Sequence, residues 1–348
     1  MAIAVAPGSN GAAALANRPP IAFHGGMDFR KTLHEVGSGI YAYVQHDGSW
    51  GWSNSGLVTD GEQTLLVDTL FDLRLTSEML DAYRRAVPAA ARIGMLVNTH
   101  ANGDHTFGNQ LVPGAQIIAS RRCAEEMSDV PPTMLAGLMR QASQLGPTGT
   151  YLERIFGPFR FDGIALTRPT RTFDGELSLH VGDKEVQLVE VGPAHTRGDT
   201  IVLVPGDRVV YAADILFNGG HPIVWAGPVA NWVRALDRIL DLDVDTVVPG
   251  HGPLAGKAQV RELKGYFEYL DREARARHEA GMTPLEAARD ISLADYSTWG
   301  EAERVVANVA ALYREYAGSE ERPAPLEVMA QMAALSLDGG RAVAGGGR

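Results

Sequence analysis

Cysteine is almost missing from this sequence. Cys123 is the single cysteine in 348 residues, so the chain can form no internal disulfide and no zinc site built on paired cysteines. A lone thiol is typical of proteins kept in a reducing compartment. We therefore expect a cytoplasmic location.

Long apolar runs and an excess of positive charge are missing too. No stretch approaches the roughly 20 apolar residues that a membrane helix needs. Residues 1–20 lack the charged start and apolar core of a secretory signal, so we expect a flexible N-terminal arm there. The net charge is -11 and the pI about 5.4, whereas nucleic-acid-binding surfaces are basic. We expect a small-molecule substrate as partner, and neither a nucleic acid nor a membrane.

Short apolar strands alternate with amphipathic helices over most of the chain, which predicts an α/β fold. The strand–helix series occurs twice, up to about residue 128 and again from about 171 to 260. Two similar halves should therefore face each other. Residues 130–165 break the rhythm and are expected to form a helical insertion over the mouth of the site.

The remaining boundaries follow from composition. We place the main domain at residues 21–260, a helical extension at 261–318 and a tail at 319–348. Because residues 339–348 are rich in glycine, we expect the tail to be partly disordered. Its apolar run, residues 326–337, is a candidate surface for pairing two copies into a homodimer.

One polar turn carries three potential metal ligands. It follows an apolar strand expected at residues 93–97 and presents His100, Asp104 and His105 within six residues. Imidazole and carboxylate are the usual ligands of Zn²⁺ and related metals. For this stretch alone, a polar turn with two surface histidines is the alternative.

Three further residues of the same kinds follow later strands. His195 lies in a turn after a strand expected at 185–191, Asp214 ends an apolar strand, and His251 closes a strand that begins at residue 246. The strand ends at one rim of an α/β protein are where sites are usually built. Four such motifs in order favour a metal site over a surface turn.

Together these motifs resemble those of the metallo-β-lactamase-fold hydrolases, over about residues 37–260. The resemblance implies an αβ/βα four-layer sandwich with the metal site at one edge of its two sheets, here with a helical insertion and a C-terminal helical extension. Asp68, which ends a strand expected at 64–68, matches an aspartate of that family and is expected to support the ligands. The metal ligands that the resemblance implies are His100, Asp104, His105, His195, Asp214 and His251.

Asn102 stands where that family usually has a histidine of the first of its two metal sites. An amide oxygen is a poor zinc ligand compared with imidazole, so this site keeps only His100 and His195, with Asp214 between the two sites. We expect either a single zinc ion, at the second site, or a second ion that is bound only weakly. A single active metal is also found in the hydrolytic dehalogenases of the superfamily. The complete second set is Asp104, His105, Asp214 and His251.

These residues predict hydrolysis. A zinc ion with an open position lowers the pKa of bound water from about 15.7 towards 7 and supplies hydroxide. Asp104 would coordinate the ion and orient the nucleophile. His100 or His195, if free of metal, would transfer a proton to the leaving group.

Aromatic residues are expected to wall the pocket, although a structural role is an alternative for each. Trp50 and Trp52 lie in one loop, and His221 and Trp225 in the loop over residues 217–227. Such walls favour an apolar or aromatic substrate: an ester, thioester, lactone, amide or aryl halide. The residues expected to contact substrate or support ligands are Trp50, Trp52, Asp68, Asn102, His221 and Trp225.

Two other functions remain open on the sequence. An acyl thioesterase or polyketide cyclase of the same fold is the first, because relatives with this fold act on acyl thioesters. The second is a non-catalytic metal- or ligand-binding protein, with Asn102 as a sign of lost chemistry.

Overall fold

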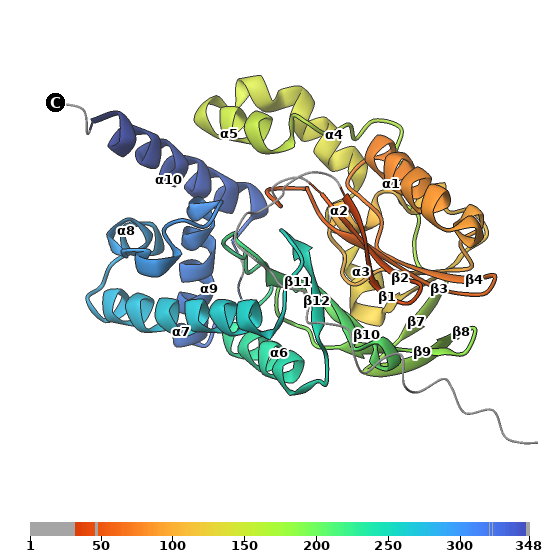
Figure 1. Cartoon of the computed structure of the whole chain (residues 1–348). Coiled ribbons are helices and arrows are strands. Elements are labelled where there is room, and N and C mark those ends of the chain that lie inside the picture. The colour runs from red at the N-terminus through yellow and green to blue at the C-terminus, as the bar shows by residue number, and fades with distance from the viewer. Residues whose placement is uncertain (1–31, 46–47, 320, 322, 346–348) are drawn as a thin grey trace, which may run out of the picture.

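Two β-sheets pack face to face in this protein, with helices on their outer surfaces (Figure 1). The computed structural model describes residues 32–45, 48–319, 321 and 323–345. The flexible arm expected at residues 1–20 lies outside them. None of the described helices combines the length and the apolarity that crossing a membrane requires.

The first sheet has seven strands, in the order β1-β2-β3-β4-β5-β6-β7. Neighbours pair antiparallel from β1 to β4 and parallel from β4 to β7. Its strands are β1 (Thr32–Gly37), β2 (Ile40–Val44), β3 (Ser55–Asp60), β4 (Gln63–Val67), β5 (Met95–Val97), β6 (Gln116–Ser120) and β7 (Arg171–Phe173).

The second sheet has five strands, in the order β12-β11-β10-β9-β8. Its neighbours pair antiparallel except for β11 and β12, which run parallel. Its strands are β8 (Glu176–Val181), β9 (Lys184–Glu190), β10 (Thr200–Val204), β11 (Val209–Phe217) and β12 (Thr246–His251).

Helices connect and cover these strands. Those of the described part are α1 (Leu73–Ala86), α2 (Gly103–Thr106), α3 (Arg121–Glu126), α4 (Pro132–Gln141), α5 (Gly146–Phe156), α6 (Val229–Asp241), α7 (Lys257–Glu279), α8 (Pro284–Asp290), α9 (Val305–Ala317) and α10 (Pro325–Gly345).

Successive side chains of a strand pack alternately against the opposite sheet and against the helices that cover the outer face. On β4, Leu65 and Val67 belong to the core between the sheets, whereas Leu66 belongs to the core beneath the helices, as the two-residue period of a strand requires. On α6, Trp232 is fully buried in that outer core. The layers confirm the predicted fold class, two sheets flanked by helices.

Strand β11 differs from its predicted extent. The sequence places Asp214 at the end of this strand, but the strand continues to Phe217 because Ile215, Leu216 and Phe217 are all buried. The pairing with β12 is irregular around Ala213, whose φ is 47°. Asp214 therefore projects from a distorted strand interior rather than from a loop.

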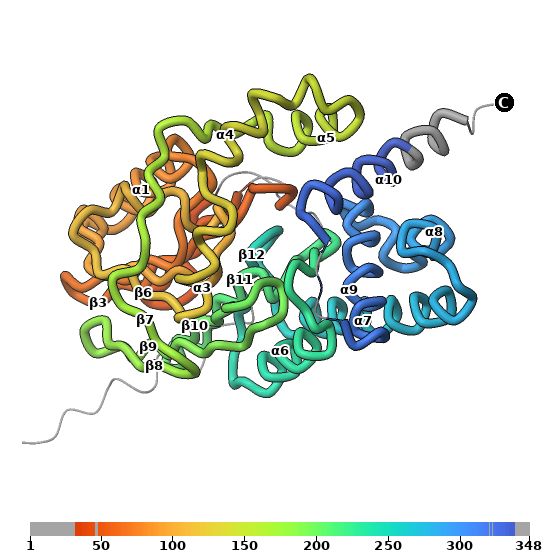
Figure 2. Tube along the Cα trace, turned by 180° about the vertical axis from the view of Figure 1, so that it is seen from behind, coloured from red at the N-terminus to blue at the C-terminus, as the bar shows by residue number. Residues whose placement is uncertain are grey.

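The insertion and the tail lie side by side. Figures 1 and 2 show α5 next to α10, at the end of the molecule where β11 and β12 finish. The tail expected to be partly disordered forms α10, because its apolar face finds a partner: Met332 is fully buried, and its sulfur lies 4.0 Å from the Tyr151 hydroxyl of α5. Part of the run proposed for dimer contacts is thus used within the chain, and the homodimer stays a prediction.

Candidate metal centre

A buried network holds the polar turn that follows β5. The side-chain amide of Asn98 donates to Asn109 Oδ1 at 3.2 Å, and the amide of Asn109 donates to Asn98 Oδ1 at 2.8 Å. The backbone N–H of Thr200 donates to the Thr99 carbonyl at 2.8 Å. The turn is therefore fastened to both halves of the protein.

Four histidines point their Nε2 atoms at one centre, and each is at most 4% exposed. Every Nδ1 atom instead faces a partner outside the centre. Backbone carbonyls and the Asp68 carboxylate can only accept, so these Nδ1 atoms carry the hydrogen and each Nε2 presents a lone pair. The Nδ1 contacts are His100 to Thr99 Oγ1 (3.0 Å), His105 to Asp68 Oδ2 (2.9 Å), His195 to the Ile223 carbonyl (2.8 Å) and His251 to the Gly48 carbonyl (3.1 Å).

The Thr99 hydroxyl extends this pattern to the fourth ring. It donates to Asp68 Oδ2 at 2.6 Å, so its oxygen accepts the Nδ1 hydrogen of His100. Asp68 thereby supports two of the four imidazoles, one directly and one through Thr99.

Two carboxylates face the imidazole lone pairs. Asp214 Oδ1 lies 3.1 Å from His105 Nε2, and Asp214 Oδ2 lies 3.2 Å from His195 Nε2. Asp104 Oδ2 lies 3.3 Å from His251 Nε2. These nitrogen and oxygen atoms repel one another unless a proton or a metal ion lies between them.

Three buried atoms at the centre lack any hydrogen-bond partner: His100 Nε2, His105 Nε2 and Asp214 Oδ1. Buried polar atoms are rarely left unpaired. Nitrogen and carboxylate oxygen donors converging in this way suit zinc and related divalent metals. The residues present therefore fit a metal ion.

The charges of the centre also favour a cation. Burial lowers the pKa of the His105 imidazole, but Asp214 and Asp104 overcome this and hold it well above its usual range. At His251 burial is likewise outweighed, by Asp214 and by the hydrogen bond to Asp104, and the pKa rises to about 9. Positive charge, as protons or as metal, is thus attracted to these two rings.

The other two rings behave differently. Burial is the main cause that lowers the pKa of His100 well below its usual range, and it lowers the pKa of His195 as well. Both are therefore neutral at pH 7. Asp214 remains ionised, because the surrounding histidines, His251 foremost, outweigh its burial and hold its pKa well below the usual range.

A cavity of about 660 Å³ opens over this centre. Asp104, His195, Asp214 and His251 contribute to its lining. Its other walls are mostly apolar and include Trp50, Phe71, Phe156, Phe217, Trp225 and, from the insertion and tail, Val130, Met134, Leu138, Leu326 and Met329. Residues of the insertion therefore line the cavity above the centre.

Two of the residues expected at the pocket lie elsewhere. Trp52 packs on Phe159, with ring centroids 5.0 Å apart, and is not part of the cavity wall. His221 is fully buried between Tyr266 and Trp299. Helix α7 and the segment before α9 cover it, and their approach to this loop has no local sequence signal.

Residues 48–251 match the model of the metallo-beta-lactamase superfamily, a range that holds all six candidate ligand residues of the centre. This chain belongs to that superfamily. The resemblance inferred from the motifs is thereby confirmed.

Two curated relatives are similar to this superfamily member over part of their length. One is the 2,4-dinitroanisole O-demethylase subunit alpha of Nocardioides sp. (strain JS1661), 30% identical over 216 residues, which are 60% of this chain and 54% of that protein. The other is the linear primary-alkylsulfatase of Pseudomonas sp. (strain ATCC 19151), 24% identical over 265 residues, 67% of this chain and 48% of that protein. The chain spans about half the length of these relatives.

Solved structures share the fold. The stereoselective inverting sec-alkylsulfatase Pisa1 from Pseudomonas sp. matches with a TM-score of 0.60 and 18% identity, over 84% of this chain and 51% of that one. The metallo-beta-lactamase from Pontibacter korlensis matches with a TM-score of 0.51 and 16% identity, over 67% of this chain and 98% of that one.

Among the described residues of this superfamily member, three overlapping groups have ligand atoms no more than 4.8 Å apart. One contains Asp68 with His100 and His105, but Asp68 faces His105 Nδ1, on the far side of that ring from the centre. The other two, the first and second groups below, are His100, His195 and Asp214, and Asp104, His105 and His251. Asn102 contacts the first group: its Nδ2 lies 2.9 Å from His195 Nε2. Since His195 carries its hydrogen on Nδ1, the Asn102 amide donates to the lone pair that a metal at this group would need.

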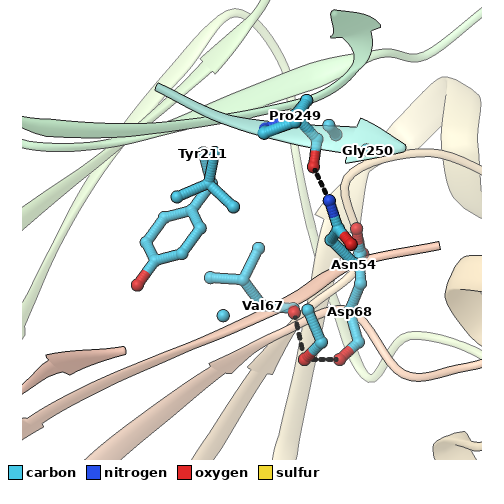
Figure 3. A pocket seen from close by; sticks show the side chains of 10 residues that line it. Asn54, Val67, Asp68, Tyr211, Pro249 and Gly250 are labelled. Atoms are coloured by element: carbon cyan, nitrogen blue, oxygen red, sulfur yellow. Dashed lines mark hydrogen bonds between the residues drawn. The ribbon is translucent and has the colours of Figure 1, made fainter. Parts of the chain in front are cut away.

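Gly250 fits the strand next to Asp214 only because it has no side chain. A Cβ atom there would lie 1.9 Å from Asp214 Oδ1 and 2.7 Å from the Ala213 carbonyl carbon. Asn54, which precedes β3, holds this strand in place: its side-chain amide donates to the Pro249 carbonyl at 2.9 Å (Figure 3) and its backbone N–H to the Gly250 carbonyl at 2.7 Å. Gly250 thus leaves room for Asp214, a candidate metal ligand.

We predict that Gly250→Ala weakens zinc binding about 10- to 100-fold, as loss of ligand support does in other metal sites, because the added methyl group displaces Asp214. Competition with a fluorescent zinc chelator measures the affinity. Gly206→Ala is the control, since a Cβ at Gly206 meets nothing within 4 Å. Wild-type affinity in the folded Gly250→Ala protein would contradict the assignment of Asp214.

Proposed function

We propose that this protein is a zinc-dependent hydrolase of small molecules with an apolar or aromatic body. The observation that carries the proposal is the group of imidazoles and carboxylates at the floor of a largely apolar cavity. Three of their atoms, His100 Nε2, His105 Nε2 and Asp214 Oδ1, have no hydrogen-bond partner. A metal-binding floor beneath apolar walls suits a substrate whose body packs against the walls while its polar bond meets the metal.

One zinc ion would be held by Asp104, His105, Asp214 and His251. The chemistry that zinc supplies is a hydroxide nucleophile at neutral pH, together with polarisation of the bond under attack. Asp104 belongs both to this set and to the cavity lining, so its carboxylate can orient a water next to the substrate.

His195 is the residue best placed to move a proton. It lines the cavity, is neutral at pH 7 because burial lowers its pKa, and is held by the Ile223 carbonyl on its far side. If the Asn102 amide leaves His195 Nε2, this nitrogen can take up a proton and pass it to a leaving group.

The cavity walls narrow the substrate class. Trp50 and Trp225 lie with ring centroids 6.3 Å apart, and Trp50 and Phe156 meet edge to face at 6.1 Å. The names of the two curated relatives denote an aryl methyl ether and linear alkyl sulfates, each an apolar body bonded through oxygen. These observations favour cleavage at an oxygen substituent of an apolar body over cleavage of a phosphodiester.

We predict metal-dependent hydrolysis of at least one member of a panel of 4-nitrophenyl acetate, 4-nitrophenyl sulfate, dodecyl sulfate, 2,4-dinitroanisole and a chlorinated nitrobenzene. Chelation should stop the reaction and zinc should restore it. His251→Ala should lower kcat/KM by about 100-fold or more, since it removes a ligand, whereas His180→Ala on the exposed face of β8 should change nothing. No hydrolysis of any member of the panel would point to a non-catalytic binding protein. Purified protein without bound metal, or equal activity in His251→Ala, would contradict the metal-dependent mechanism.

The number of metals is a separate proposal. Because the Asn102 amide occupies the His195 lone pair, we expect one tightly bound zinc ion per chain in the wild-type protein and a stoichiometry approaching two in Asn102→His. Asn102→Ala is the matched control: it frees the His195 lone pair but adds no imidazole, and because the first group then still lacks a ligand, the ratio should stay at one. Elemental analysis after dialysis measures the ratio, and two ions in the wild-type protein would refute the single-metal centre.

A further inference from the structure

One cation in the cavity wall is left without a counter-charge. Arg304 ends a short 3-10 turn (Ala302–Arg304) directly before α9, is 2% exposed, and lines the cavity. Arginine is almost never buried unless it is paired. A partner for this guanidinium is therefore expected either among the residues around it or in the cavity.

The described residues supply Arg304 with stacking and one hydrogen bond, and no carboxylate. Its guanidinium carbon lies 4.2 Å from the centre of the Trp50 ring and 5.5 Å from that of Phe217. Its Nη1 donates to the His221 carbonyl at 2.9 Å. Its Nε has no partner.

The acids nearby are engaged with other cations. Glu303, the preceding residue, pairs with Arg154 at 3.0 Å. Glu126 and Asp129, which line the cavity, pair with Arg197 at 3.4 Å and 2.6 Å. Within the described part of the chain, no carboxylate oxygen lies within 4.0 Å of Arg304, which leaves its charge uncompensated.

Trp50 adds a second donor without an acceptor. It is the ring on which Arg304 stacks, it lines the same cavity, and its buried Nε1 has no hydrogen-bond partner. A cation–π contact recovers less free energy than burying an unpaired charge costs. Both side chains line one cavity and each has a donor without an acceptor, and an anionic or strongly accepting oxygen group would also compensate the charge of Arg304.

We propose that Arg304, together with the Trp50 indole N–H, binds an oxygen-rich acceptor group of the substrate, such as a carboxylate, sulfonate, sulfate or nitro group. A guanidinium is suited to such groups because its fork of N–H donors matches two oxygens at once. This proposal deepens the proposed function, on which it rests for the idea that the cavity holds a substrate. Arg304 is in these terms a specificity residue and not a catalytic one.

Phe217 connects this subsite to the metal centre. It stacks on His251 with ring centroids 5.1 Å apart and planes at 2°, while Arg304 lies against the same ring. A small molecule held at Arg304 is therefore within reach of the centre. Its apolar body would lie along the aromatic wall formed by Trp50 and Trp225.

Paired probes that differ only in charge test the proposal. Binding of 4-tert-butylbenzoate and of the neutral 4-tert-butylbenzamide is measured by calorimetry at pH 7.5. The wild-type protein should bind the carboxylate about tenfold or more tightly than the amide, as a charge-assisted hydrogen-bond pair allows. Arg304→Met should abolish this preference, Arg304→Lys should keep part of it, and Trp50→Phe should reduce it slightly.

Arg154→Met is the matched control, because it removes a neighbouring cation that pairs with Glu303 outside the cavity wall; it should keep the full preference. A role of Arg304 confined to holding the His221 carbonyl would lower the melting temperature of Arg304→Met without changing the preference in the folded protein. Equal binding of both probes by the wild-type protein, which needs no variant, would overturn the proposal.

Chelation separates this subsite from the metal. The preference should survive removal of zinc, and a preference lost on chelation but kept in Arg304→Met would assign the carboxylate to the metal and overturn the proposal. Hydrolysis by the wild-type protein is measured separately. If the protein prefers the carboxylate but hydrolyses nothing, only the proposed hydrolase function is contradicted. If it hydrolyses a substrate but shows no preference, only the Arg304 subsite is contradicted.

Discussion

Repulsion between lone pairs governs the centre of this protein. Four imidazoles have their hydrogens fixed on Nδ1 by groups that only accept, or by the Thr99 hydroxyl, so every Nε2 faces inward as an acceptor. The oxygens of Asp104 and Asp214 lie 3.1 to 3.3 Å from three of these atoms. Such an arrangement is stable only with positive charge inside it, and the rest of the structure keeps the six side chains from turning away.

The residues that keep the centre in place come from every layer of the fold. Asp68 and Thr99 from the first sheet hold His105 and His100, and Gly250 lets β12 pass close to Asp214. The helical extension contributes as well: the Asn308 side chain of α9 accepts from the Val224 N–H at 3.0 Å and donates to the Pro222 carbonyl at 2.9 Å. Between those two residues lies Ile223, whose carbonyl orients His195. The extension is thus part of the site's support.

The metal motifs could be read from the sequence because most of them lie at or just after the end of an apolar strand, and strand ends meet at one rim of the fold. Asp214 is the exception, since it lies inside β11. The local sequence pattern does not predict contacts between residues that lie far apart in the chain. His221 is buried by Tyr266 and Trp299, and α10 packs against Tyr151. Both contacts join residues far apart in the chain, so the sequence around them does not predict either contact. Arg304 has no sequence signal for the same reason. An arginine before a helix is common, and only the packing of Trp50 and Phe217 against it distinguishes this one.

Anomalous diffraction at the zinc absorption edge, on crystals of the zinc-loaded protein, tests the central claim most directly. One strong peak bounded by Asp104, His105, Asp214 and His251 is the expected result, with Asn102 still on His195. A peak of equal height among His100, His195 and Asp214 would contradict the single-metal centre. No peak at either group would contradict the metal centre itself.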